Sequence, residues 1–194
     1  MARTKLSDEL KEAISLLSSK EKDKLLFRLI AKDAALVERL IFELLEDKET
    51  KDDRRASIYQ RIDKGFDRYR YYSPGYLLLT LRSLSGDINR HLKTTKDKYG
   101  EIQLNLLMLN KSLGLFGQKI RNAPSRKSRT FDNYVVKRVV KLVGLLRKLH
   151  EDYLLDFQED IQKLGQYIDE QPRMKILADE LGLDIEMLKQ GEIY

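Results

Sequence analysis

Apolar residues recur at alternating steps of four and three residues along the middle of the chain, which is the spacing of one face of an α-helix. There are three such stripes, and extra apolar positions make each one wider than a two-stranded coiled-coil seam. Wide stripes at this rhythm predict a bundle of helices packed at shallow angles. The stripes are Leu77, Leu81, Leu84, Ile88 and Leu92; Ile102, Leu106, Leu109, Leu113, Phe116 and Ile120; and Val135, Val139, Leu142, Leu146, Leu149 and Tyr153.

The third stripe continues less regularly to Ile168. A single helix over residues 131–168 would be about 57 Å long at the usual rise per residue. Because this is long for a chain of 194 residues, we expect bends at Gly144 or Gly165. The preceding segment RNAPSRKSRT, residues 121–130, is polar and contains a proline, so we predict a flexible loop there.

The first fifty residues predict three short amphipathic helices. Ser7 and Asp33 are suited to cap the first and the third, and Ser19 to begin the second. Short helices with tight joints are similar to one and a half units of an α-solenoid. The predicted regions are short N-terminal helices packed on the main bundle (residues 1–50), the main bundle (residues 51–170) and a C-terminal helical hairpin or cap (residues 171–194).

The segment FDRYRYYSPGY, which begins at Phe66, combines aromatic and basic residues. Phe66 shares a helical face with Ile58 and Ile62, so we predict that this face packs in the core. Ser73 precedes Pro74, an order that favours a helix cap followed by the first helical residue. Aromatic rings beside basic grooves are also typical of single-strand nucleic-acid binding, which remains the alternative interpretation.

The C-terminal segment MKILADELGLDIEMLK has the spacing of a helix-turn-helix. The second helix of a DNA-binding helix-turn-helix would face phosphates. Here that helix would carry three acidic residues and only one basic residue, namely Asp184, Glu186, Glu192 and Lys189. The acids favour a capping hairpin instead, with Gly182 in the turn and Asp184 as the cap of the second helix.

Composition indicates the cellular compartment in which the protein is expected. The chain has no cysteine, which excludes a disulfide framework and thiolate chemistry. The first residues, MARTKLSDELKEA, are charged and lack the apolar core of a secretory signal. No apolar run approaches the roughly 20 residues needed to cross a bilayer. We therefore expect a cytoplasmic protein that has no membrane partner.

The net charge of +6 conceals an uneven distribution. Residues 51–100 hold 12 basic and 6 acidic residues, and residues 101–150 hold 11 and 2. Residues 151–194 reverse this balance, with 4 basic and 12 acidic residues. Either the acidic end folds back and neutralises the basic middle, which we favour, or the basic middle binds an anionic partner such as nucleic acid.

A nucleic-acid surface, if present, would be built from arginines and lysines of this basic middle. Several of them fall on or beside the predicted loop, and loops of this kind can follow a phosphate backbone. The alternative is an ordinary solvated loop and helix face. The candidate residues are Arg54, Arg61, Arg68, Arg121, Arg126, Lys127, Arg129 and Lys137.

Signatures of catalysis are absent from the sequence. The two histidines, His91 and His150, lack the Glu-x-x-His spacing of di-iron bundles, and no phosphate-binding glycine loop is present. We expect His91 to be a partly buried, hydrogen-bonded residue. No cofactor is expected.

A row of carboxylates is the remaining candidate for a metal site. Asp152, Asp156 and Asp160 would share one helical face, and carboxylates alone can hold magnesium. A solvated acidic face explains the same spacing.

We therefore predict an all-α protein, a multi-helix bundle of about seven or eight helices. The leading hypothesis is a non-enzymatic interaction or scaffold protein that binds another protein or its own copy. The alternatives are nucleic-acid binding through the basic middle and, third, a magnesium-dependent hydrolase. A fold of this class does not choose among them, because bundles host many functions.

Overall fold

The computed structural model describes residues 4–46, 50–67 and 73–193, and these ranges are helical without any strand. The predicted all-α class is therefore confirmed, with ten α-helices in the described ranges rather than seven or eight. None of these helices combines the length and the apolar composition that a bilayer crossing requires. The chain divides into two compact units, Met1–Asp47 and Lys48–Tyr194.

The first unit consists of three short helices. Ser7 and Asp33 cap the first and third helices, as predicted, and Ser18 forms a capping box with Glu21 at the start of the second. The predicted solenoid-like character and packing on the main bundle stay predictions. The three helices are α1 (Asp8–Ser15), α2 (Ser19–Ile30) and α3 (Ala34–Leu44).

The apolar faces of this first unit are not enclosed. None of the three helices contains a buried residue. Leu16 and Leu45 are each 80% exposed. The amphipathic pattern therefore predicts the helices correctly, but their apolar faces do not form a core. The large apolar side chains exposed here are Leu6, Leu10, Ile14, Leu16, Leu26, Phe27, Leu29, Ile41, Leu44 and Leu45.

The second unit holds the hydrophobic core. Four long helices come first, and three shorter ones follow after two turns of 3-10 helix. They are α4 (Thr50–Asp67), α5 (Pro74–Thr95), α6 (Lys98–Asn122), α7 (Ser125–Leu146), η1 (Glu151–Tyr153), η2 (Leu155–Phe157), α8 (Gln158–Asp169), α9 (Pro172–Glu180) and α10 (Ile185–Lys189).

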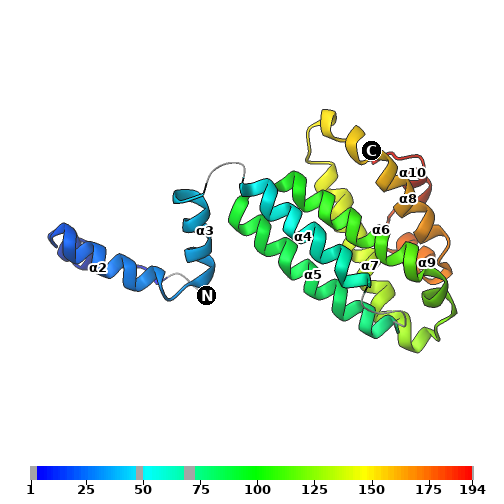
Figure 1. The fold of residues 1–194 in the computed structure, drawn as a ribbon, viewed down its shortest axis with the longest axis horizontal. Coiled ribbons are helices and arrows are strands. Elements are labelled where there is room, and N and C mark those ends of the chain that lie inside the picture. The colour runs from blue at the N-terminus through cyan, green and yellow to red at the C-terminus, as the bar shows by residue number, and fades with distance from the viewer. Residues whose placement is uncertain (1–3, 47–49, 68–72, 194) are drawn as a thin grey trace. The chain divides into compact units, whose positions relative to one another are not determined.

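Helix α6 is the central helix of this unit, in contact with α4, α5, α7 and α8 (Figure 1). Helix α5 packs along α6, and both α4 and α7 pack against the two of them. The C-terminal helices extend the bundle, since α8 lies against α6, α9 against α7 and α8, and α10 against α8. The connections between α5 and α6 and between α6 and α7 are only two residues long, which makes successive helices antiparallel.

The three apolar stripes meet inside the bundle, as predicted. Leu81, Leu109 and Val139, one from each stripe, are completely buried. Burying one such side chain contributes about 1.5–3 kcal/mol, so the three stripes account for much of the stability of the unit. Phe66 also joins the core, with its ring centroid 6.3 Å from that of Phe116.

The joint before α5 agrees in part with the sequence interpretation. Ser73 caps α5, and its Oγ accepts a hydrogen bond from the N–H of Tyr76. Tyr76 itself is 68% exposed, so it does not bury its ring in this corner. The sequence also places Tyr71 and Tyr72 beside this joint, and both lie outside the described residues.

Two local predictions are wrong. The expected flexible loop over residues 121–130 is almost entirely helical, because α7 already begins at Ser125. Ser128 and Phe131 are buried there, and this packing holds the first turns of α7 in place. The second error concerns where the chain bends within residues 131–168: α7 ends at Leu146 and the chain turns through η1 and η2 before α8, so the break lies neither at Gly144 nor at Gly165.

The turn and the helix cap predicted for the C-terminal segment are both present. Gly182 lies in the turn with a φ of 68°, a conformation that favours glycine. Asp184 caps α10 and accepts a hydrogen bond from the N–H of Met187. Gly165 lets α10 approach α8 closely, because a Cβ there would lie 2.8 Å from the nitrogen of Lys189. The predicted bend at Gly165 is replaced by this close contact.

Candidate functional site

The corner between α5 and α6 is built from two residues with special backbone roles. Lys96 ends α5 in the left-handed conformation, with a φ of 59°, and its N–H donates to the carbonyl of Leu92 at 2.9 Å. Glycine usually occupies this position, and a side chain costs about 1 kcal/mol there. Asp97 follows at once and caps α6 by accepting a hydrogen bond from Gly100 N–H at 3.0 Å.

A buried polar cluster anchors this corner. His91 Nε2 faces Asp97 Oδ2 at 3.2 Å, and Arg55 Nη1 from α4 reaches the same oxygen at 3.4 Å. The Oγ1 of Thr95 accepts a hydrogen bond from the N–H of Asp97. The predicted hydrogen bonding of His91 is confirmed, and its side chain is more completely buried than expected.

The charge state of Asp97 follows from these contacts. Burial by itself would raise the pKa of the Asp97 carboxyl. The hydrogen bonds from His91 and Gly100 and the charge of Arg55 outweigh burial and hold that pKa below its ordinary value. Asp97 is therefore a fixed anion at neutral pH, and it holds the corner that carries Lys96 and Lys98.

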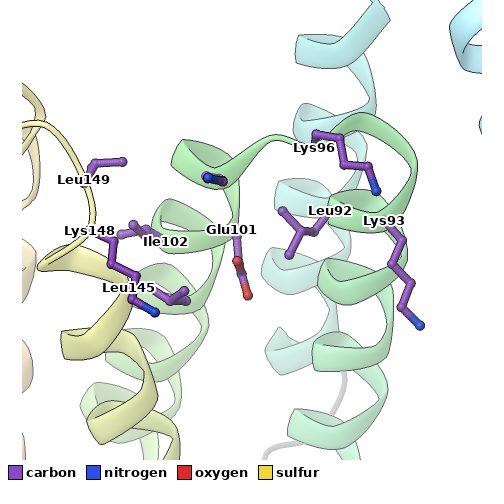
Figure 2. Close-up of a pocket in the computed structure, with 9 residues that line it drawn as sticks. Leu92, Lys93, Lys96, Glu101, Ile102, Leu145, Lys148 and Leu149 are labelled. Atoms are coloured by element: carbon purple, nitrogen blue, oxygen red, sulfur yellow. The ribbon is translucent and has the colours of Figure 1, made fainter.

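An apolar pocket of about 350 Å³ opens beside this corner. Figure 2 shows that its walls come from the end of α5, the start of α6 and the end of α7. Four aliphatic side chains, four lysines and one glutamate surround it. The lining residues are Leu92, Lys93, Lys96, Lys98, Glu101, Ile102, Leu145, Lys148 and Leu149.

The charges around this pocket, which we call the lysine-rimmed pocket, are not balanced locally. Within the described part of the chain, Lys93, Lys96, Lys98 and Lys148 make no ion pair, and all four are exposed. Glu101 is buried and is already neutralised by Lys141, whose Nζ lies 3.0 Å from Glu101 Oε1. The pocket therefore presents an aliphatic floor under an uncompensated positive rim.

The predicted nucleic-acid residues are spread over several helices and do not form one site. Arg54 and Arg61 lie on α4, and the Nη2 of Arg61 is held by Asp87 Oδ2 at 2.8 Å. Arg121 lies at the end of α6 and pairs with Glu170 at 3.0 Å. Arg68 is outside the described residues.

The remaining predicted basic residues all lie on α7, so Arg126, Lys127 and Arg129 are helical and not part of the expected loop. Arg126, Lys127 and Arg129 occupy its first two turns, and Lys137 lies exposed farther along. Of these four, Arg126 and Arg129 line a second pocket, between the first turns of α7 and α9.

The predicted carboxylate row does not form. Asp152, Asp156 and Asp160 fall in η1, η2 and α8, so they do not share one helical face. Asp152 lies beside His150, and Asp156 accepts a hydrogen bond from Tyr99 at 3.2 Å. Within residues 4–46, 50–67 and 73–193, no group of three His, Cys, Asp or Glu side chains is placed to hold a metal ion.

Sequence reasoning missed the lysine-rimmed pocket. One signal was available, because the segment HLKTTKDKYG places Lys93, Lys96 and Lys98 within six residues at the end of one apolar stripe. The contribution of Lys148 had no such signal, since it depends on where α7 ends in space.

Comparison with models of protein families, with curated proteins and with solved structures finds no match to this chain.

Proposed function

We propose that this protein is a non-enzymatic interaction module that binds an acidic, amphipathic helical segment of a partner protein in the lysine-rimmed pocket. The observation that carries this proposal is the combination of an aliphatic floor with four lysines that lack partners in the described chain. An occupant that satisfies both parts has apolar side chains on one face and carboxylates beside them.

The two kinds of contact contribute differently. One buried leucine-sized side chain contributes about 1.5–3 kcal/mol, whereas an exposed ion pair contributes at most about 1 kcal/mol. The apolar side chain therefore supplies most of the affinity. The lysines accelerate association with acidic partners and disfavour basic ones.

A protein partner fits the pocket better than a nucleic acid. No aromatic ring lines the pocket, so a base would find no stacking platform. Two of the predicted nucleic-acid residues, Arg61 and Arg121, are engaged by Asp87 and Glu170.

Fluorescence anisotropy tests the proposal with a labelled peptide that carries leucines along one helical face and glutamates beside them. We expect binding that weakens as salt rises, because the rim charges are exposed and screened. The double substitution Lys93→Glu/Lys148→Glu should weaken binding at least about tenfold, a loss of about 1.4 kcal/mol.

Lys137→Glu is the matched control, because it reverses an exposed lysine on α7 outside the pocket. This variant should bind the peptide within about twofold of the natural protein after allowance for net charge. Equal losses in the two variants would contradict the proposal. Tighter binding of a single-stranded oligonucleotide at the same lysines would replace it with the nucleic-acid alternative.

A further inference from the structure

A second pocket, of about 480 Å³, lies between the first turns of α7 and α9. Three arginines converge on it from two helices, and two aliphatic residues of α9 form a wall. We call it the arginine pocket. Its lining residues are Ser125, Arg126, Arg129, Asp132, Arg173, Ile176 and Leu177.

The N-terminus of α7 lacks the side chains that usually stabilise the start of a helix. Pro124 occupies the cap position and makes no side-chain hydrogen bond to the helix. The N–H group of Arg126 therefore lacks the partner that a capping side chain supplies. Basic residues follow in the first turn without an acid, although the N-terminus of a helix already carries partial positive charge. A bound anion relieves both defects.

Arg173 is held in place by three hydrogen bonds. Its Nε donates to Asp132 Oδ2 at 2.9 Å, its Nη1 to the carbonyl of Arg121 at 3.2 Å and its Nη2 to the carbonyl of Ile120 at 2.6 Å. Two of its five N–H groups stay available for a ligand. Arg126 and Arg129 are exposed and make no ion pair in the described ranges, so they are free to close on an anion.

Asp132 adds a requirement that a simple anion does not meet. Its side chain is almost completely buried, and its Oδ1 has no hydrogen-bond partner within the described residues. A buried carboxylate oxygen of this kind accepts a hydrogen bond. The ligand that complements the arginine pocket therefore carries negative oxygens for the arginines and an O–H donor for Asp132.

We infer that the arginine pocket binds a phosphate group that carries a proton on one oxygen. Inorganic phosphate keeps at least one proton at neutral pH, whereas sulfate keeps none, so the pocket distinguishes two ions of the same shape. Arg126, Arg129 and Arg173 contact the negative oxygens, and Asp132 Oδ1 accepts the proton-bearing hydroxyl. This inference does not depend on the proposed function, because it uses a different part of the bundle.

Isothermal titration calorimetry at constant ionic strength tests the inference with three probes: inorganic phosphate, methyl phosphate and sulfate. We expect inorganic phosphate to bind at least about tenfold more tightly than sulfate. Methyl phosphate is mostly unprotonated at neutral pH, because the second pKa of a phosphate monoester is about 6, so it should bind more weakly than inorganic phosphate, and equal binding would overturn the role of the proton. Equal affinity for phosphate and sulfate would overturn the role of Asp132.

Variants at exposed positions keep the test independent of folding. Arg126→Gln/Arg129→Gln should abolish measurable phosphate binding, while Lys127→Gln, on the same turn but outside the pocket lining, should leave it unchanged. Retention of phosphate binding by the double variant would overturn the site. Asp132→Asn should reduce the preference for phosphate over sulfate, and thermal unfolding of that variant without ligand reports separately on its stability.

Discussion

His91 Nε2 lies 3.2 Å from Asp97 Oδ2, and both side chains are almost completely enclosed by protein. Arg55 approaches the same carboxylate from α4, so one buried anion joins three helices. The two-residue corner that this anion holds carries Lys96 and Lys98 into the rim of the proposed binding pocket. The geometry of the candidate site therefore depends on a cluster that does not itself touch the occupant.

Substitution of Asp97 should destabilise the protein in a pH-dependent way. Asp97→Asn removes a buried charge with several partners, and we expect a loss of about 1–3 kcal/mol at pH 7. Because the folded-state pKa of Asp97 lies below its ordinary value, the stabilisation is complete above about pH 4 and disappears as the pH falls through the lower folded value.

Urea unfolding of both proteins at several pH values measures this linkage. The difference in unfolding free energy between the natural protein and Asp97→Asn should shrink as the pH is lowered from 5 towards 2. A difference that stays constant over that range would contradict the assignment of Asp97 as a stabilising anion.

Gly100 is required by the same cluster. A Cβ at this position would overlap the Asp97 carboxylate and lie 2.9 Å from Cδ of Arg55. Gly100→Ala should therefore lower the melting temperature, although alanine favours a helix by about 1 kcal/mol over glycine. Gly86→Ala in α5 is the matched control, because a Cβ there meets nothing within 4 Å, and it should raise the melting temperature.

Arg173 and Asp132 should behave as a coupled pair. Arg173→Ala leaves a buried carboxylate without its cation and should cost about 3–5 kcal/mol. Arg173→Lys should not restore stability, because an ammonium group does not reproduce the three hydrogen bonds of the guanidinium. In a double-mutant cycle with Asp132→Asn, the combined loss should be clearly smaller than the sum of the single losses. Simple additivity would show that the two residues stabilise the fold separately.

Hydrogen exchange should separate the two compact units. The helices of the first unit contain no buried residue, whereas α5 and α6 are lined with completely buried ones. Amides of α1–α3 should therefore exchange at least about a hundredfold faster than those in the middle of α5 and α6. Protection of α1–α3 equal to that of α6 would mean that their apolar faces are covered in solution.

The parts of the fold that depend on local periodicity could be predicted from the sequence. The stripes through Leu81, Leu109 and Val139 turned out to be the core, and Ser73 and Asp184 cap the helices that they were expected to cap. Each of these features is encoded within a few neighbouring residues, so no knowledge of the tertiary structure was needed.

The errors arise where tertiary packing overrides composition. Residues 121–130 look like a loop because they are polar, but the burial of Ser128 and Phe131 keeps the chain helical. The lysine-rimmed pocket was predictable only in part: Lys93 and Lys96 are neighbours in the sequence, but Lys148 joins them only because three helix ends meet in space. Asp132 and Arg173 are likewise distant in sequence and adjacent in the fold.

A charge-swap experiment tests the proposed function most directly. The acidic peptide should bind the natural protein and lose affinity for Lys93→Glu/Lys148→Glu. A peptide with the same leucines but lysines in place of the glutamates should show the opposite preference, and fluorescence anisotropy measures all four combinations. We predict that the lysine-bearing peptide binds the Lys93→Glu/Lys148→Glu variant. Four equal affinities would contradict the assignment of the pocket as the site of recognition.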